Sequence, residues 1–371
     1  MKYYSFFFAA ITLLLASCSK DKETMCETPT LSLGSNASAE SSSPLVVKDL
    51  TVAQLNGDSA SAFFKNASII DVFGDTAVLL ENDPNMSRLI LYGIKDGRYL
   101  GDINHRGQGP GEYRVILGAF VDERDGSVLL PNFDNPSVYK YLLSTDSLEA
   151  TLQRDMVMSM IEPIGGVSTA INVAAPSFDG LKIYQYDANY DLIDSIKVDG
   201  FRGGNFNMLW KNAGTNGVFM IADTLYTLMP GVLNQTAILQ RGDYALTPEK
   251  DEEVTMKVMS GSDEMELLKP YILIRDIQYT DGKMLVTTMY DGNKYSDLYD
   301  MTTGGLLYRS QYDRLSIPSA IVVEDKGGKT IKVQSLFAKN GKWYGLVEDA
   351  AMENADSEMV DENYSIVEFS I

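Results

Sequence analysis

Leu91-Tyr92-Gly93-Ile94 is the clearest copy of a short apolar segment, an aliphatic residue followed by tyrosine, that recurs along the chain. Later copies are Val138-Tyr139-Lys140-Tyr141, Ile183-Tyr184-Gln185-Tyr186, Leu225-Tyr226-Thr227-Leu228, Leu298-Tyr299-Asp300-Met301 and a degenerate Ile366-Val367-Glu368-Phe369. The first intervals between the tyrosines are 47, 45 and 42 residues, close to the period of a four-stranded propeller blade. The repeat therefore predicts a series of similar β units.

The sequence around each copy reads as strand, turn and strand. Apolar runs such as residues 77–80 precede the copies, and turns rich in Gly, Asp and Lys, such as residues 95–98, follow them. Short β-type runs separated by turn residues at this spacing are typical of all-β proteins. We expect no helix of useful length, except for one or two turns at residues 263–268.

Taking the tyrosine segment as the third of four strands gives six blades. They are expected at residues 67–104, 116–154, 161–199, 205–241, 271–312 and 331–371. The last copy has no fourth strand after it, and an unpaired edge is a liability. Residues 45–52 are therefore expected to supply the outer strand of the last blade. The prediction is an all-β fold, a six-bladed β-propeller closed by an N-terminal strand, over residues 44–371.

The N-terminal residues have a different character. Residues 1–17 have the form of a signal peptide, in which Lys2 precedes an apolar run too short to span a bilayer. The segment Leu15-Ala16-Ser17-Cys18 is similar to the lipobox of bacterial lipoproteins, which predicts lipid attachment at Cys18. The alternative is a plain secretory signal with an incidental cysteine. Residues 18–43 are rich in Ser, Thr and Asn, which predicts a flexible tether.

Charge and cysteine content exclude several classes of function. The chain has 51 acidic and 31 basic residues, a net charge of -20, so general nucleic-acid binding is not expected. Cys18 and Cys26 both precede the predicted propeller, whose body contains no cysteine. This excludes disulfides, cysteine–zinc sites and a cysteine nucleophile in the body. No metal site and no cofactor is predicted.

The glycine-rich stretch Gly107-Gln108-Gly109-Pro110-Gly111-Glu112, the six-blade count and the lipobox together resemble the TolB-like six-bladed β-propeller lipoproteins of Gram-negative bacteria. The resemblance covers residues 44–371. It implies an outer-membrane lipoprotein, anchored through its N-terminal lipid. The charged residues 19–23 resemble a signal for the cell surface, and the periplasmic face is the alternative.

Residues 105–113 form a crossing between two predicted strands, and we expect it to help line the mouth of the central cavity. Its glycines permit a positive φ, so successive amides can form an anion-binding nest. His105 is the single histidine of the chain; it is either a general base or a hydrogen-bonded surface residue. We expect Glu112 either to pair with Arg106 or to cap backbone amides.

Each predicted crossing carries one arginine, which suggests a rule of position in an acidic chain. These residues either form a ring of cations that binds carboxylate, sulfate or phosphate groups, or brace each crossing against carbonyls and carboxylates. The candidate ligand-binding residues are His105, Arg106, Gln108, Glu112, Arg154, Arg202, Arg241 and Arg314.

Three functions remain open from the sequence. The first is a membrane-anchored binding module that engages a ligand or partner on the face carrying the crossings. The second is a surface glycoside hydrolase or lyase that uses two carboxylates in the channel mouth. The third is a structural subunit of an outer-membrane protein complex. Glycans and anionic small molecules are the expected ligands of the first.

Overall fold

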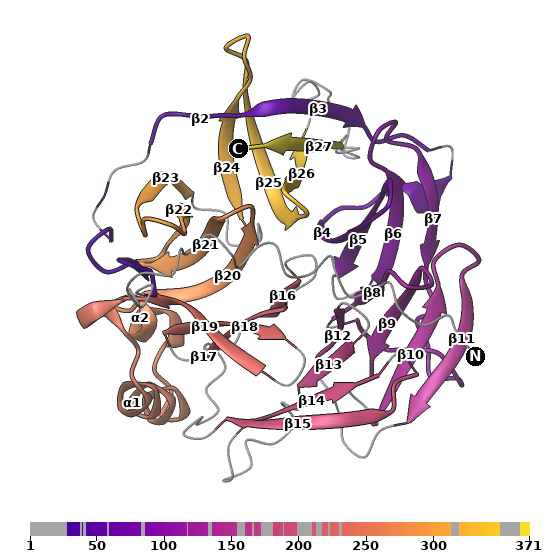
Figure 1. Cartoon of the computed structure of the whole chain (residues 1–371), viewed down its shortest axis with the longest axis horizontal. Helices are drawn as coiled ribbons and strands as arrows, with labels where there is room; N and C mark the ends of the chain where they lie inside the picture. The colour runs from indigo at the N-terminus through magenta and orange to yellow at the C-terminus, as the bar shows by residue number, and fades with distance from the viewer. Residues whose placement is uncertain are drawn as a thin grey trace, which may run out of the picture.

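The computed structural model describes residues 28–37, 39, 42–57, 59–82, 86–116, 118–132, 136–153, 160–164, 167–171, 181–187, 189–198, 210–212, 217–221, 223–229, 232–312, 319–348 and 364–371. Its strands pair into six sheets that lie side by side around a common centre (Figure 1). This confirms the all-β propeller arrangement expected from the repeat.

The strands of each sheet follow one another in the chain. The first three sheets contain β4 (Ala67–Phe73), β5 (Thr76–Asn82), β6 (Ser87–Gly93) and β7 (Tyr99–Ile103); β8 (Phe120–Asp122), β9 (Ser127–Pro131), β10 (Ser137–Leu142) and β11 (Ser147–Gln153); and β12 (Met160–Ile164), β13 (Val167–Ile171), β14 (Leu181–Tyr186) and β15 (Leu192–Val198). The fourth and fifth contain β16 (Trp210–Asn212), β17 (Gly217–Ile221), β18 (Thr224–Met229) and β19 (Val232–Leu239), with β1 (Thr30–Leu31) at the edge; and β20 (Leu273–Thr280), β21 (Lys283–Tyr290), β22 (Asn293–Asp300) and β23 (Leu306–Tyr312). The sixth contains β2 (Leu45–Val46), β24 (Ala320–Glu324), β25 (Thr330–Lys339), β26 (Lys342–Glu348), β27 (Tyr364–Ser370) and β3 (Lys48–Gln54).

The repeated segment explains how neighbouring sheets are held together. Successive residues of a strand face opposite sides of its sheet. Leu91 accordingly packs with the second sheet, whereas Tyr92, which is 1% exposed, packs with the sixth. In the fifth sheet Leu298 faces the sixth and Tyr299 faces the fourth. In these two sheets the aliphatic–tyrosine pair therefore fills both interfaces of its own sheet.

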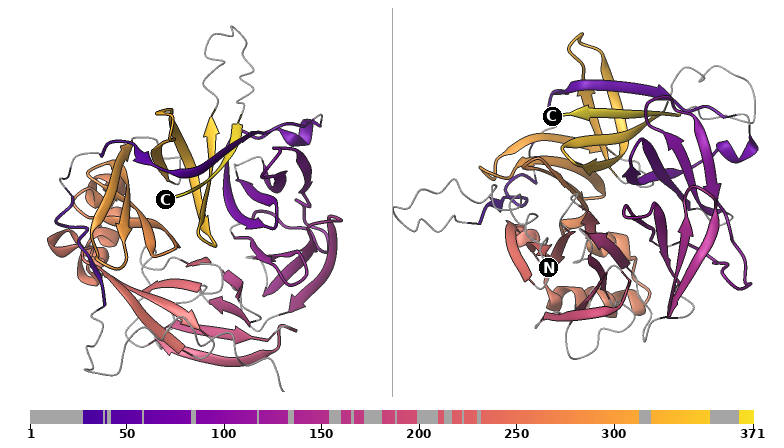
Figure 2. Two further views of the ribbon diagram at one scale, coloured as in Figure 1. Left: turned by 45° about the horizontal axis from the view of Figure 1, so that its top comes forward. Right: turned by 45° about the vertical axis from the view of Figure 1, so that its right-hand side comes forward.

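The N-terminal strands lie beside sheets built from distant parts of the chain. Strand β3 pairs antiparallel with β27, with Thr51 opposite Glu368 and Gln54 opposite Ser365 (Figure 2). This differs from the expected range of residues 45–52, because Leu45–Val46 pairs in parallel with β24 instead. A left-handed Asp49 (φ 52°) and a register shift in the ladder mark a bulge near the start of β3.

The flexible tether expected at residues 18–43 is wrong for residues 28–37. Strand β1 pairs in parallel with β19, and Leu31 and Leu33 are 0% and 2% exposed. Leu31 and Leu33 join the hydrophobic cluster between the fourth and fifth sheets. The polar composition of the segment concealed these two alternating leucines, which supply enough apolar surface to hold it in place. The signal peptide and Cys18 lie outside the described residues.

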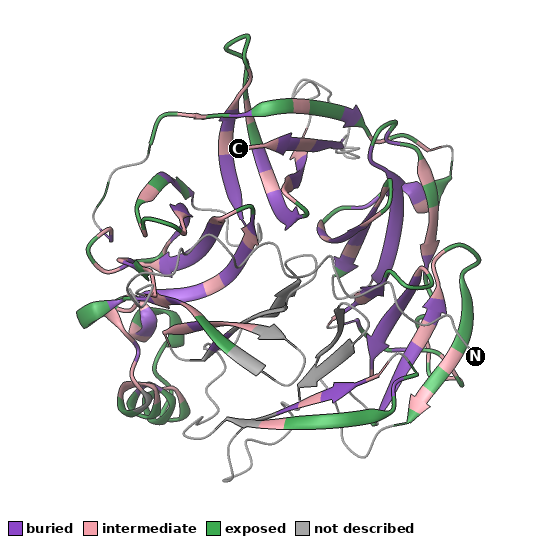
Figure 3. Cartoon of the chain, viewed as in Figure 1, coloured by how far each residue is buried: buried purple, intermediate pink, exposed green. Residues whose placement is uncertain are grey.

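The expectation of almost no helix is wrong between β19 and β20. That connection holds a short 3₁₀ turn, Gly242–Tyr244, and the helices α1 (Pro248–Met259) and α2 (Glu264–Leu268). Thr247 caps α1 by accepting a hydrogen bond from the Lys250 amide, and Pro248 occupies the first turn. Figure 3 shows α1 largely exposed. Among the described residues, no helix is both long and apolar enough to cross a bilayer.

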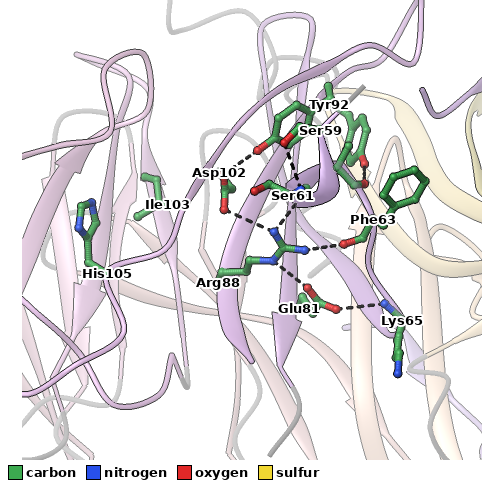
Figure 4. A network of polar contacts seen from close by, with 12 residues as sticks. Ser59, Ser61, Phe63, Lys65, Glu81, Arg88, Tyr92, Asp102, Ile103 and His105 are labelled. Atoms are coloured by element: carbon green, nitrogen blue, oxygen red, sulfur yellow. Dashed lines mark hydrogen bonds and ion pairs between the residues drawn. The ribbon is translucent and has the colours of Figure 1, made fainter. Parts of the chain in front are cut away.

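A buried arginine fixes the segment that connects β3 to β4. Arg88 forms an ion pair with Glu81 (Nε–Oε2, 2.8 Å) and donates to the carbonyls of Ser61 (2.8 Å) and Phe63 (2.5 Å) (Figure 4). Its guanidinium also lies 3.4 Å from Asp102. The segment includes the 3₁₀ turn Ala60–Ala62. Through these contacts Arg88 ties the connection after β3 to strands β5, β6 and β7.

Lys339 joins the inner strands of separate sheets. Its ammonium lies 2.6 Å from Asp71 Oδ1, donates to the Val72 carbonyl at 2.8 Å and also pairs with Glu123. The side chains of Lys339 and Asp71 are 3% and 5% exposed. The lysine thus connects the end of β25 with β4 and with the turn after β8, close to the contact between the last and first sheets.

Replacing Lys339 alone is expected to be far more damaging than replacing the pair. Lys339→Met leaves the Asp71 carboxylate buried without its cation, which should lower the free energy of unfolding by about 3–5 kcal/mol. The Lys339→Met, Asp71→Leu double variant should recover most of that loss. Urea unfolding curves measure both. Equal stabilities of the single and double variants would contradict a buried pair that matters to the fold.

Removing β3 is expected to lower stability sharply, because β27 then loses its partner ladder and one packed face. A chain that begins at residue 56 should melt well below a chain that begins at residue 44. Both chains lack β1, so the comparison isolates the later N-terminal residues. Equal melting temperatures would show that the β3–β27 ladder contributes little.

Candidate functional site

A cavity of about 450 Å³ lies where the inner strands β4, β20 and β25 come together. These strands are neighbours near the centre of the ring (Figure 1). Strands β21 and β22 and helix α2 complete its walls. Its lining residues are Ser68, Ile69, Ile70, Met265, Arg275, Asp276, Gln278, Met289, Lys294, Ser335 and Leu336.

Each of the three inner strands carries a β-bulge where it borders the cavity. The register shifts between Ile69 and Asp71 in β4, between Ile274 and Asp276 in β20, and between Gln334 and Phe337 in β25. A bulge adds a residue that opposes no partner of its own and re-aims its side chain. The residues in these bulges are Ile70, Arg275, Ser335 and Leu336, and all of them line the cavity.

The bulge of β25 is held from two sides. Ser335 has a left-handed backbone (φ 55°), which is uncommon for a residue with a side chain. Its amide donates to the Ser319 carbonyl at 2.9 Å, and its hydroxyl accepts from the Ile69 amide at 2.9 Å. The Leu336 amide donates to the Ser319 hydroxyl at 3.0 Å. These bonds fix the wall of the cavity between the sixth and first sheets.

The polar part of the lining is cationic, although the chain as a whole has a net charge of -20. Arg275 and Lys294 are the two cations, and Asp276 is the single acidic residue among the described lining residues. Asp276 accepts a hydrogen bond from Gln278 Nε2 at 3.0 Å, and the Gln278 carbonyl oxygen accepts from the Ala338 amide. Asp276 and Gln278 are therefore held in place by the protein itself.

Burial makes these cations unusual. Lys294 is 7% exposed, and burial together with the neighbouring Arg275 lowers its pKa, against the opposing effect of Asp276. Burial also lowers the pKa of Arg275, and Glu264 opposes that shift. An anion in the cavity would favour the charged form of both side chains. The site is thus suited to binding a negatively charged group.

The crossing at residues 105–113 lies elsewhere, against the outer strands of the second sheet. Gly111 accepts a hydrogen bond from the Tyr141 hydroxyl, and a Cβ added at Gly111 would meet the side chain of Leu148 on β11. The crossing does not contribute to the described lining of the cavity. It leaves β7 at the rim of the ring and packs on the next sheet, so the expected position at the channel mouth is wrong for this stretch.

Glu112 fills the nest that the glycines were expected to offer to an anion. The Gly109 amide donates to Glu112 Oε2 at 2.7 Å, and a Cβ at Gly107 would collide with the same carboxylate. Glu112 thus caps a backbone amide, as the second of its two predicted roles requires. Gln108 and Arg106 are exposed.

His105 has a structural environment. Its Nε2 lies 2.7 Å from Asp146 Oδ1, and its ring stacks on Tyr141 with the centroids 4.9 Å apart. Its backbone amide donates to the Tyr113 hydroxyl at 3.2 Å, which in turn donates to the Ile103 carbonyl at 2.9 Å. These contacts agree with a hydrogen-bonded surface histidine.

Arg241 matches the bracing alternative for the arginines. It is 4% exposed, its Nε lies 2.6 Å from Asp223 of the same sheet, and it donates to the Ile272 carbonyl at 3.1 Å, just before β20 of the next sheet. Arg154, Arg202 and Arg314 lie outside the described residues. Of the arginines predicted to lie in the crossings, the structure therefore describes Arg106 and Arg241, and neither of these two lines the cavity.

Sequence reasoning missed Arg275 and Lys294. Arg275 stands beside Asp276 inside the apolar run of residues 272–277, and a charged pair within such a run is an unusual signal for a buried strand. Lys294 directly follows Asp291-Gly292-Asn293, residues that are typical of a turn. No group of three or more His, Cys, Asp or Glu side chains suited to a metal ion occurs in the described part of the chain.

Comparisons with known proteins give the fold but no activity. A family described as a 6-bladed beta-propeller matches residues 60–166. A protein from Bacteroides fragilis, described provisionally as exported, is similar in structure: its TM-score is 0.64 at 17% identity, over 88% of this chain and 95% of that one. A member of the DUF4221 family from Bacteroides vulgatus gives 0.53 at 9% identity, over 88% and 97%. No curated protein matches the sequence.

Lys294 is expected to reduce stability, because burial lowers its pKa in the folded protein. Because its folded pKa is lowered, the unfolded chain binds more protons between that value and the usual pKa of about 10.4, and stability should rise with pH across this interval. Lys294→Met should remove this rise. It should also stabilise the protein at neutral pH, by about 1.4 kcal/mol for each unit by which the pKa is lowered. Urea unfolding at several pH values tests both effects, and a Lys294→Met variant with the wild-type pH profile would contradict them.

Proposed function

We propose that this protein is an extracytoplasmic, lipid-anchored β-propeller that binds a small anionic ligand in the cavity between β4, β20 and β25. The observation that carries the proposal is the pair of cations, Arg275 and Lys294, directed into a cavity of an otherwise strongly acidic protein. Both side chains can donate charge-assisted hydrogen bonds to a bound anion, which are stronger than bonds between neutral groups.

The proposal places six blades in a ring that the N-terminal strand closes, as in TolB-like lipoproteins. The six sheets, the ladder between β3 and β27 and the family description support this arrangement. The lining of the cavity comes from the first, fifth and sixth sheets. Closure of the ring between the last and first sheets would therefore make the walls of the cavity rigid. Rigid, pre-formed walls reduce the entropy lost on binding.

The lipid anchor and the outer-membrane location are supported by the sequence of residues 15–18 and by the charged residues that follow. The similar Bacteroides fragilis protein is provisionally described as exported. A glycoside hydrolase or lyase is less well supported, because that chemistry uses two carboxylates across the substrate. Among the described residues that line the cavity, Asp276 is the single acidic one.

Anion binding is tested by titrating the purified protein calorimetrically with sodium sulfate, sodium phosphate and sodium acetate at constant ionic strength. We expect at least one of them to bind. Arg275→Gln and Lys294→Met should each weaken that binding ten- to a hundredfold, because a hydrogen bond to a charged group contributes about 1.5–3 kcal/mol. Affinity should also fall as the pH rises through the lowered pKa of Lys294.

Arg98→Gln is the matched control, because Arg98 is exposed and does not line the cavity. It should bind the anions as the wild type does. The proposal fails if none of the three anions binds, or if Arg275→Gln and Lys294→Met bind them with wild-type affinity.

Cys18→Ala tests the anchor. Without the thiol no lipid can be attached, so the variant should move from the membrane fraction to the aqueous phase in detergent partitioning. Cys26→Ala, the other cysteine, should remain with the membrane. If Cys18→Ala partitions like the wild type, the lipoprotein assignment is wrong.

A further inference from the structure

The lining of the cavity also indicates the kind of anion that it takes, an inference that rests on the proposed function. We propose that the ligand is an aliphatic monocarboxylate, a molecule with one carboxylate and a flexible hydrocarbon body. Three features of the described lining support this choice over a sugar acid or an inorganic dianion: its charge, the form of its cations and the chemistry of its apolar walls.

The charge of the lining matches a single negative charge. Arg275 and Lys294 contribute two positive charges and Asp276 one negative charge, which leaves one positive charge. Lys294 and Asp276 are 7% and 9% exposed, so these charges interact with little screening by water. A monoanion balances the charge of the lining, and Glu264, which acts on Arg275 from outside the lining, disfavours further negative charge. A dianion would leave an excess negative charge beside Asp276, which is unfavourable in a buried site.

The cations are suited to a carboxylate. A guanidinium presents its N–H groups in a planar fork that matches the two oxygens of a carboxylate, and an ammonium adds a compact charge beside it. Arg275 stands in the bulge of β20, with Ile274 and Asp276 paired on either side of it. The backbone that carries the Arg275 guanidinium is therefore held in place by the pairing of β20 with β21.

The apolar walls are aliphatic. Ile69, Met289 and Leu336 are 5%, 8% and 3% exposed, and Ile70 and Met265 complete this part of the lining. No aromatic residue is among the lining residues that the structure describes. Sites for sugars use aromatic side chains against the faces of the ring, whereas aliphatic and thioether side chains pack well around a hydrocarbon chain.

The two methionines allow the site to adapt to chains of different length. Met289 lies on β21 within the propeller, and Met265 lies on α2, in the connection between β19 and β20. Met265 is 40% exposed, so it stands where the cavity meets solvent. Unbranched thioether side chains change rotamer easily and fill irregular gaps. Met265 should therefore contact the hydrocarbon end of the ligand.

The test compares ligands that share a carboxylate and differ in the body. The purified protein is titrated calorimetrically with acetate, butyrate and hexanoate, and with glucuronate and phosphate, at constant ionic strength. We expect affinity to rise about fourfold for each added methylene, the equivalent of about 0.8 kcal/mol. Hexanoate should bind more tightly than glucuronate and phosphate.

Met265→Gln keeps the length of the side chain and makes it polar. It should reduce the gain in affinity from acetate to hexanoate. The matched control is Met259→Gln, because Met259 is a methionine of the neighbouring helix α1 that is 84% exposed and lies outside the lining. If Met259→Gln weakens hexanoate binding as much as Met265→Gln does, the hydrocarbon contact lies elsewhere and the inference is wrong.

The two proposals fail in different ways. Equal affinities for acetate and hexanoate, or tighter binding of glucuronate or phosphate that still depends on Arg275, would overturn the aliphatic ligand and leave the anion site standing. Absence of binding by every anion tested would overturn the anion site, and the aliphatic ligand with it.

Discussion

The alternation of side chains along a strand is the constraint on which the rest of this structure depends. An aliphatic residue and a tyrosine stand next to each other in the third strand of a sheet, so they face opposite neighbours. Leu91 and Tyr92 pack with the second and sixth sheets, and Val138 and Tyr139 pack with the third and first. Even the degenerate copy follows the rule, because Ile366 faces the first sheet and Val367 the fifth. A dipeptide repeated at blade spacing therefore specifies both a sheet and its two interfaces.

The contact between the last and first sheets needs more than apolar packing, because it joins distant parts of the chain. Thr51 and Glu368, which face each other across β3 and β27, are 317 positions apart. Ordering such a contact requires loop closure over nearly the whole chain. The buried ion pairs of Arg88 with Glu81 and of Lys339 with Asp71 lie in the segments that flank this contact. They favour one arrangement of the strands, since a misplaced partner would leave a charge buried without compensation.

The cavity shows how a regular repeat can carry a specific site. Bulges in three inner strands re-aim Ile70, Arg275, Ser335 and Leu336 without disturbing the sheets behind them. In contrast, the glycine-rich crossing at residues 105–113 uses its own carboxylate, Glu112, to satisfy a backbone amide. A conspicuous motif therefore serves the fold, whereas the cations of the cavity stand in ordinary-looking strands.

Local patterns of apolar and turn residues were enough to predict the all-β propeller arrangement, the strands that carry the tyrosines and the helical turns at residues 263–268. Thr247 and Pro248 are likewise a local signal for the start of α1. Tertiary structure alone decided that Leu31 and Leu33 pack between two sheets, that Leu45–Val46 pairs with β24, and that Arg275 and Lys294 share a cavity. The physical reason is that a bulge, a parallel edge pairing and the convergence of three inner strands each depend on segments far apart in the chain. The apolar pattern of a single strand does not show which distant residues that strand will face.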